Sequence, residues 1–244
     1  MRTALLAALL LSATGVLAQE PPAAPPPKSW TGSFGAGLAL TSGNTDTQTW
    51  NLSAATKYEP KTRFLFKGDA LYLRGSTNGE KQVDKATATA RGEYTLSERT
   101  FAFGEVSYLR DPFKAISYLI APVAGGGIRL IRTDTRSLTV DAAVGAQIES
   151  NTFVGRTSSG AVKAGENFEW ALSPESKVTQ KLTGLWKTND FADALYHFDV
   201  GIAASIAARA ELSVAYTYDY KARPVPSTLE KGDSALFAAL LFKF

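Results

Sequence analysis

His197 is the only histidine in this chain of 244 residues, and imidazole is the side chain best suited to proton transfer near neutral pH. Asp199 and Ser205 share its parity along an alternating segment, so a histidine, a carboxylate and a hydroxyl face one side of a strand. A Ser-His-acid hydrolase needs these groups within hydrogen-bond reach. Ser205 is eight residues from His197, roughly 26 Å along a strand, so Ser213 on the next segment is the better candidate. A hydrolase of the phospholipase kind using His197 is therefore kept as an alternative.

Charged side chains recur on the parity of His197 through most of the chain. If neighbouring strands pair antiparallel, these charges line one surface, and Glu93 should lie diagonally near Lys67 and Arg63. Mutual pairing is the favoured interpretation, and a charge-lined channel is the functional one; because both signs occur, any ion selectivity should be weak. The predicted lining residues are Arg63, Lys67, Asp69, Lys85, Arg91, Glu93, Asp141, Glu149, Lys163, Glu169, Lys181, Lys187, His197, Asp199, Asp219 and Lys221.

The elements that position these charges have a period of two, as strands do, from Trp30 to Phe244. Leu138, Val140 and Ala142, for example, alternate with Thr139 and Asp141. The pattern indicates about twelve strands, joined alternately by short turns and by longer loops, which is the habit of outer-membrane barrels. The second parity holds Thr, Ser, Asn and charged residues, which suits a wet lumen.

A closed barrel in lipid is favoured over a soluble periplasmic sandwich by the apolar parity. That parity is nearly free of Lys and Arg, and an Arg or Lys at mid-depth in lipid costs about 2–4 kcal/mol. Backbone groups find no water in hydrocarbon, so a spanning sheet must close. Aromatic residues gather near strand ends, as in membrane-interface belts. The predicted interface aromatics are Trp30, Trp50, Tyr58, Tyr72, Tyr94, Trp170, Trp186, Tyr196, Tyr220 and Phe244. The predicted fold class is therefore all-β, an antiparallel transmembrane β-barrel of about twelve strands.

Three places depart from the simple pattern. Phenylalanines 101 and 103 lie on one parity and Val106 and Tyr108 on the other, so a bulge between them is expected to switch faces. Pro122 lies within an apparent strand, which argues against ordinary pairing there. Glu166 and Gln180 fall on the apolar parity, and the pattern offers no explanation for them.

The N-terminal segment predicts export. Residues 1–18 have a positive start, a short apolar run and small residues before a predicted cleavage site after Ala18, as secretory signal peptides do. Residues 19–29 form a Pro-rich linker, and residues 30–244 the barrel. With a formal charge of +3, no cysteine and one histidine, the sequence predicts no nucleic-acid partner, no metal site and no cofactor.

Several short motifs resemble the salt-induced outer-membrane protein family, catalogued as domain of unknown function 481. They are Trp30-Thr31-Gly32-Ser33, Thr41 with Ser42-Gly43-Asn44-Thr45, Arg99-x-Phe101-x-Phe103, Tyr108 with Asp111-Pro112-Phe113, and Gly125-Gly126-Gly127. The resemblance implies an outer-membrane barrel and a link to salt or osmotic stress, and it transfers no catalytic residue.

The last strand ends on Phe244, which resembles the signal read by the barrel assembly machinery, so that machinery and outer-membrane lipid are the expected partners. The predicted function is a non-enzymatic, narrow, weakly selective channel or envelope-stress barrel. A non-conducting structural or adhesion barrel is the first alternative, and the oligomeric state stays open.

Overall fold

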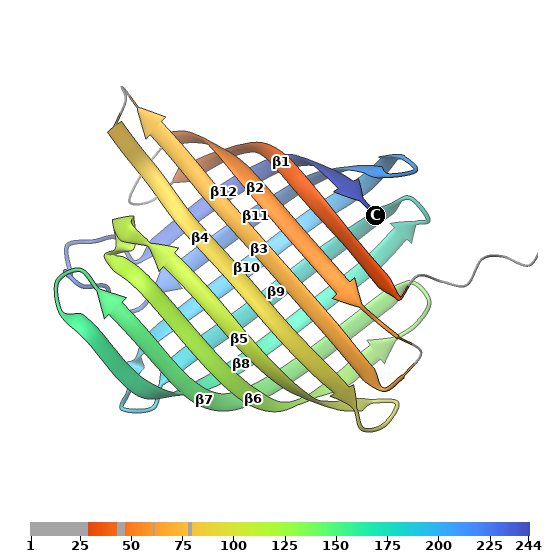
Figure 1. Cartoon of the computed structure of the whole chain (residues 1–244), viewed down its shortest axis with the longest axis horizontal. Helices are drawn as coiled ribbons and strands as arrows, with labels where there is room; N and C mark the ends of the chain where they lie inside the picture. The colour runs from red at the N-terminus through yellow and green to blue at the C-terminus, as the bar shows by residue number, and fades with distance from the viewer. Residues whose placement is uncertain (1–28, 43–46, 61, 78–79) are drawn as a thin grey trace, which may run out of the picture.

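Twelve antiparallel strands close into one barrel in the computed structural model, which describes residues 29–42, 47–60, 62–77 and 80–244 (Figure 1). Each strand pairs with its neighbours in the chain, and β1 pairs with β12 to close the sheet. The predicted all-β barrel is therefore confirmed. The strands are β1 (Trp30–Ser42), β2 (Thr47–Tyr58), β3 (Phe64–Thr77), β4 (Glu80–Thr95), β5 (Thr100–Asp111), β6 (Ile116–Arg132), β7 (Arg136–Asn151), β8 (Gly155–Ser173), β9 (Ser176–Lys187), β10 (Asp190–Ala207), β11 (Ala210–Lys221) and β12 (Gly232–Lys243).

Some of the predicted features lie outside the described residues. These are the signal peptide over residues 1–18, nearly all of the linker and the motif residues Gly43, Asn44 and Thr45. Ser42 is the last residue of β1. None of the described helical segments is long and apolar enough to cross a membrane.

Alternation along each strand produces an apolar outer surface. Leu38 is 71% exposed, whereas the next residue, Ala39, is 2% exposed because it points into the barrel. Phe34, Val144 and Ile202 are likewise large apolar side chains exposed on the outside. An exposed apolar surface of this extent marks contact with a membrane or with another protein.

The seam between β1 and β12 brings the two ends of the barrel sequence together (Figure 1). Phe244 extends this pairing, since its backbone N–H donates to the carbonyl of Gly32 at 3.1 Å. Farther along the seam, a Cβ at Gly37 would lie 2.0 Å from the carbonyl oxygen of Ala238, so this close approach of two backbones requires glycine. We call the rim with Trp30 and Phe244 the terminal end and the opposite rim the loop end.

The inner surface is less polar than the alternation predicts. One buried apolar cluster joins Leu73 and Val83 to Phe237, and a second joins Ile116 to Leu119 and neighbouring residues. The expectation of an inner parity made only of polar and charged residues is therefore wrong. Apolar side chains share that parity with the charges, and the curved wall packs them into clusters.

Two expected irregularities in β5 and β6 turn out differently. β5 pairs with β4 in unbroken register from Arg110 to Phe101, so the predicted bulge is absent, and the phenylalanines simply point inward. Pro122 lies within β6 opposite Val106 of β5. The recorded pairing with β7 passes from Ile120 to Val123 without it, which fits the missing N–H of proline. Pairing is therefore disturbed on one side of β6 only.

Candidate functional site in the lumen

The most concentrated chemistry of the described residues lies inside the barrel, where ion pairs connect strands that are not neighbours. Such pairs must run across the interior, because two or more strands separate their partners along the wall. The four that define the interior are Arg91–Asp141, Lys163–Glu105, Lys85–Asp219 and Lys221–Glu149. Charged residues that share one parity in the sequence thus pair with residues of opposite charge inside the barrel.

The Arg91 cluster consists of Arg91, Glu93, Glu105, Asp141 and Lys163. The guanidinium of Arg91 donates to Glu93 at 2.8 Å, to Glu105 at 3.1 Å and to Asp141 at 2.9 Å. Lys163 pairs with the second carboxylate oxygen of Glu105. The planar guanidinium has several N–H donors that point in different directions, so it can bind three carboxylates at once. The side chain of Arg91 is only 12% exposed, so this cluster is a densely packed group on the inner wall formed by β4, β5, β7 and β8.

Two phenylalanine rings cover the Arg91 cluster. The Arg91 guanidinium carbon lies 3.6 Å from the ring centroid of Phe103, a cation–π contact, and Arg129 lies 4.9 Å from that of Phe101. A Cβ at Gly127 would lie 2.3 Å from the Phe101 ring, so this glycine leaves the space that the ring occupies. The apolar rings and the charged fork together form a dense layer.

The predicted diagonal neighbour of Glu93 is also present. Lys67 Nζ lies 3.2 Å from Glu93 Oε1, so this predicted pair is confirmed, while the structure records no contact with Arg63. Lys67 of β3 and Glu93 of β4 lie on adjacent strands, so this pair extends the cluster along the wall and not across the lumen.

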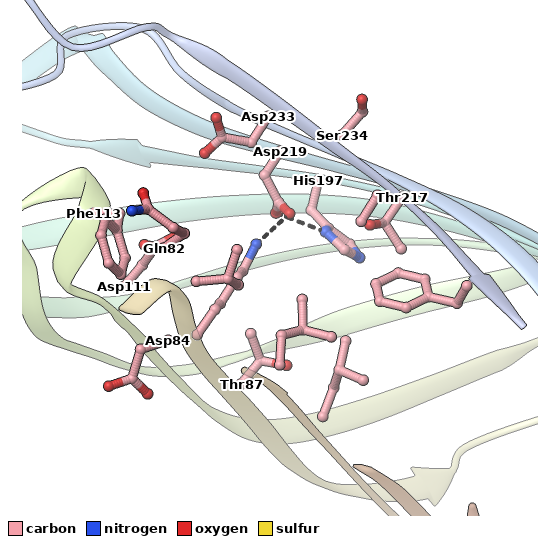
Figure 2. Close-up of a pocket in the computed structure, with 16 residues that line it drawn as sticks. Gln82, Asp84, Thr87, Asp111, Phe113, His197, Thr217, Asp219, Asp233 and Ser234 are labelled. Atoms are coloured by element: carbon pink, nitrogen blue, oxygen red, sulfur yellow. Dashed lines mark hydrogen bonds and ion pairs between the residues drawn. The ribbon is translucent and has the colours of Figure 1, made fainter. Parts of the chain in front are cut away.

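A second cluster lies toward the loop end and is centred on Asp219 (Figure 2). The Asp219 cluster consists of Lys85, Lys114, His197, Asp219 and Asp233. Asp219 contacts Lys85 Nζ at 2.5 Å and His197 Nδ1 at 2.9 Å, one with each carboxylate oxygen. Lys85 belongs to β4 and His197 to β10, so the carboxylate of β11 connects the two walls.

Lys114 enters this cluster from a loop. The connection between β5 and β6 forms a short 3-10 turn over Pro112–Lys114, whose cap is the side chain of Asp111. Lys114 is buried and lies 3.0 Å from Asp233 and 3.2 Å from the backbone oxygen of Asp219. The turn therefore reaches from one wall to β11 and β12 on the other.

A third cluster, the Glu149 cluster, joins β7, β9 and β11. Glu149 accepts from Lys187 at 3.0 Å and pairs with Lys221, whose side chain is 2% exposed. Lys187 also pairs with Asp193 at 2.6 Å. Two lysines thus face two carboxylates, so the formal charges of this part of the lumen are balanced.

A cavity of about 190 Å³ lies between the clusters. Leu109, Ile116 and Leu119 line part of it, whereas Asp69 and Lys181 are among its polar lining residues. Glu105 and Lys163 of the Arg91 cluster and Lys85, His197 and Asp219 of the Asp219 cluster also line it. The cavity is therefore amphipathic and bounded by charge at both ends.

The remaining predicted lining residues are placed less centrally. Arg63 and Glu169 are exposed near the terminal end, and Asp199 is half-buried with Lys181 and His197 nearby. Sequence reasoning missed Glu105 because a bulge was expected in β5; an unbroken strand would have placed Glu105 on the parity of Phe101 and Phe103. It also missed Lys114, since no periodicity shows that a loop folds inward, and Asp233, which lies at the start of β12 on the inward parity.

The arrangement around His197 does not assemble the hydrolase considered from the sequence. The hydroxyl of Ser205 accepts from Lys243 at 2.8 Å, and Ser213 is paired with Ala203 and Ala239. Neither serine is in the recorded contacts of His197, whose hydrogen-bond partner is Asp219. Within the described part of the chain, no group of three or more His, Asp or Glu side chains is arranged to hold a metal ion.

Aromatic side chains meet on the outer surface at both rims. At the terminal end, Trp30 contacts Tyr58 with 5.0 Å between ring centroids. At the loop end, Trp50 contacts Tyr72 at 5.6 Å, and Trp186 contacts Tyr196 at 5.7 Å. Tyr196 in turn lies 6.1 Å from Tyr220. These edge-on and tilted pairs connect adjacent strands into two bands.

Comparisons with known proteins agree with this architecture. The family model described as "Protein of unknown function, DUF481" matches residues 34–244. The uncharacterized protein YdiY of Escherichia coli (strain K12) is 23% identical over 207 residues, which cover 84% of this chain and 80% of YdiY.

Two solved outer-membrane structures align with most of the chain. The NanC porin has a TM-score of 0.58 at 7% identity, covering 86% of this chain and 100% of the porin. An outer membrane channel from Pseudomonas putida F1 has a TM-score of 0.52 at 14% identity, covering 93% of this chain and 100% of the channel. At these identities the likeness concerns the fold, which is that of outer-membrane barrels.

Proposed function

This chain belongs to the DUF481 family, and from that premise we propose that it is a bacterial outer-membrane barrel that forms a narrow, weakly selective channel. The observation that carries the proposal is the lumen, in which clusters of opposite charge border a cavity of about 190 Å³. NanC is named a porin and the Pseudomonas putida F1 protein a channel, and both share this fold.

The outer surface supports placement in a membrane. Leu38 and Val144 are exposed apolar residues of the outer surface, and burying such side chains is worth about 1.5–3 kcal/mol each. The closed sheet leaves no unpaired strand edge, which a hydrocarbon environment demands. The bands containing Trp30 and Trp186 suit the two headgroup regions. Lipid is therefore the proposed surrounding partner.

The number of strands and the mixed charges support a narrow and weakly selective passage. Barrels of about 8 strands have interiors filled by side chains, while those of about 16–18 strands leave an aqueous channel, so a twelve-strand barrel is intermediate. Within this width, Arg91 and Lys85 each contact carboxylates of strands that are not their neighbours. Because both signs are present at each level, neither cations nor anions meet a uniform ring.

A non-conducting structural barrel is the second candidate, and the Arg91 cluster favours it. The guanidinium contacts three carboxylates and the Phe103 ring, and its side chain is only 12% exposed. If this layer never parts, the barrel carries loops and stabilises the membrane without passing solutes.

Planar-bilayer recording of the purified barrel separates these two candidates. A channel predicts steady steps of current in potassium chloride and a reversal potential near zero across a salt gradient. The matched variant is Arg91→Ala, which should raise the step size by opening the tightest layer. Wild-type and variant barrels that both insert and carry no current would contradict the channel and support the structural barrel.

Export and assembly are proposed on the same basis. We expect cleavage after Ala18, which mass spectrometry of the mature N-terminus would test, and recognition of β12 with Phe244 by the barrel assembly machinery. A role in salt or osmotic stress would be tested by growth of a deletion strain in high salt. Lipase activity that disappears in His197→Ala would instead support the hydrolase.

A further inference from the structure

The outer surface carries one polar pair in an otherwise apolar region. Gln180 Nε2 of β9 donates to Glu166 Oε2 of β8 at 2.7 Å. Glu166 pairs in register with Val140 on one side and with Leu182 on the other, and Leu182 is 46% exposed. These neighbours and Trp170, which shares its parity, place Glu166 on the outside of the barrel.

The pair lies midway between the two aromatic bands. Trp170 is four residues from Glu166 toward the terminal end, and Val162, four residues toward the loop end, pairs with Trp186. At about 3.3 Å per residue, each band is roughly 13 Å away along the strand. Among the described outward positions between the bands, Glu166 is the one with a formally charged side chain.

A single barrel leaves much of the pair's hydrogen-bonding capacity unused. The structure records only the bond between them, although a carboxylate has two acceptor oxygens and a glutamine amide has two donors and one acceptor. In hydrocarbon no water is available to these groups, and carboxylates at mid-depth are rare and costly. Phe168 and Val200, which flank Gln180 in register, cannot satisfy them.

We propose that the outer face of β8 and β9 binds a second copy of this chain, with the polar pairs of the two copies in contact across a two-fold axis. The patch is self-complementary, because the donor Gln180 and the acceptor Glu166 lie side by side and a two-fold axis can bring each against the other's partner. The proposal rests on the membrane location proposed above, and it adds a partner to that location.

Small residues beside the pair permit close approach of two barrels. Ala142 of β7 and Ala164 of β8 pair in register immediately toward the loop end. On β9 the next position, Gly184, is covered by the ring of Trp186, which therefore borders the row of small residues. Small side chains and interchain hydrogen bonds are the features that hold membrane segments together when no hydrophobic effect drives them. The row and the polar pair therefore form one contact surface.

Removing both polar groups tests the contact. Glu166→Leu with Gln180→Leu should raise the dimer dissociation constant at least tenfold, measured by concentration-dependent energy transfer between labelled barrels in phosphatidylcholine and phosphatidylglycerol vesicles. Leucine suits the lipid surface, so the variant should still insert and fold. A wild-type barrel that inserts and stays monomeric, or a dimer unchanged in the variant, would overturn the contact. A barrel that fails to insert would contradict the membrane location instead.

Cysteine cross-linking locates the contact independently, because the chain contains no cysteine. Leu182→Cys, next to Glu166, should form a disulfide-linked dimer under mild oxidation. The matched control is Ala70→Cys on β3, an exposed outward position on another part of the wall. Equal cross-linking at both positions, or none at Leu182→Cys, would overturn the proposed surface.

Discussion

The charge clusters toward the two ends of the lumen are held in different ways. Every member of the Arg91 cluster lies on a strand, and one guanidinium holds three carboxylates at 2.8–3.1 Å. The Asp219 cluster instead includes Lys114, which comes from the turn between β5 and β6 and reaches Asp233 at 3.0 Å. A strand-held cluster can part only by rearrangement of its side chains, whereas a turn can also move its backbone. The loop end is therefore where we expect the passage to change, and the terminal end is where we expect its limiting width.

The largest expected effect comes from removing the centre of the strand-held cluster. Arg91→Ala leaves Glu93, Glu105 and Asp141 without their shared partner, and breaking a buried ion pair by removing one member costs about 3–5 kcal/mol. Equilibrium unfolding of the refolded barrel in urea measures this loss. Arg91→Lys, which keeps the charge without the fork, should lose less. A loss below about 1 kcal/mol, typical of surface pairs, would show that the cluster is solvated and not a fixed layer.

A smaller effect on stability, with a change in current, is expected at the loop end. Lys114→Ala removes the charged hydrogen bonds to Asp233 and to the carbonyl of Asp219, and because both come from one ammonium group we expect a combined loss of about 1.5–3 kcal/mol. The freed turn should make channel openings longer in bilayer recordings while the largest step size stays that of the wild type. If the step size grows and the opening times do not, the turn sets the limiting width of the passage. The limiting width would then lie at the loop end and not at the terminal end.

His197 should matter less, because Asp219 retains Lys85 as a partner when the imidazole is removed. The imidazole is 39% exposed, so His197→Ala should lower the unfolding free energy by no more than about 1 kcal/mol. Urea midpoints of wild type and variant provide the measurement. A loss above about 3 kcal/mol would place His197 among the residues that hold the Asp219 cluster together.

The smallest effect on stability is expected at Asp69, which is exposed on the inner wall and lines the cavity. The structure records no ion pair or hydrogen bond for its carboxylate, so Asp69→Asn should change the unfolding free energy by less than about 0.5 kcal/mol. Removing a negative charge from the passage should nevertheless shift the reversal potential toward anions. An unchanged reversal potential, with current still flowing, would mean that ions do not pass Asp69.

Much of the fold followed from period-two alternation. A strand that must present apolar residues to one side and polar residues to the other has only one register that satisfies both. The sequence therefore predicted that Leu38 faces outward and that Arg91 faces inward. The approximate strand number and the diagonal pair Lys67–Glu93 followed in the same way. The phenylalanines at 101 and 103 were misread because apolar side chains were assumed to face outward, whereas here they cover a charged cluster from inside.

The sequence by itself determined that this chain forms strands with two chemically different faces, because alternation is a local property of neighbouring residues. The tertiary structure alone decided which charges meet across the lumen, since Lys85 and Asp219 are separated by 134 positions and meet only after the sheet has closed. It also decided that Lys114 folds inward, and that Glu166 and Gln180 form a pair on the outside. The distance between two residues on opposite walls depends on the register of every strand pair between them. A local sequence pattern gives the register of none of these pairs, so it cannot predict which charges meet.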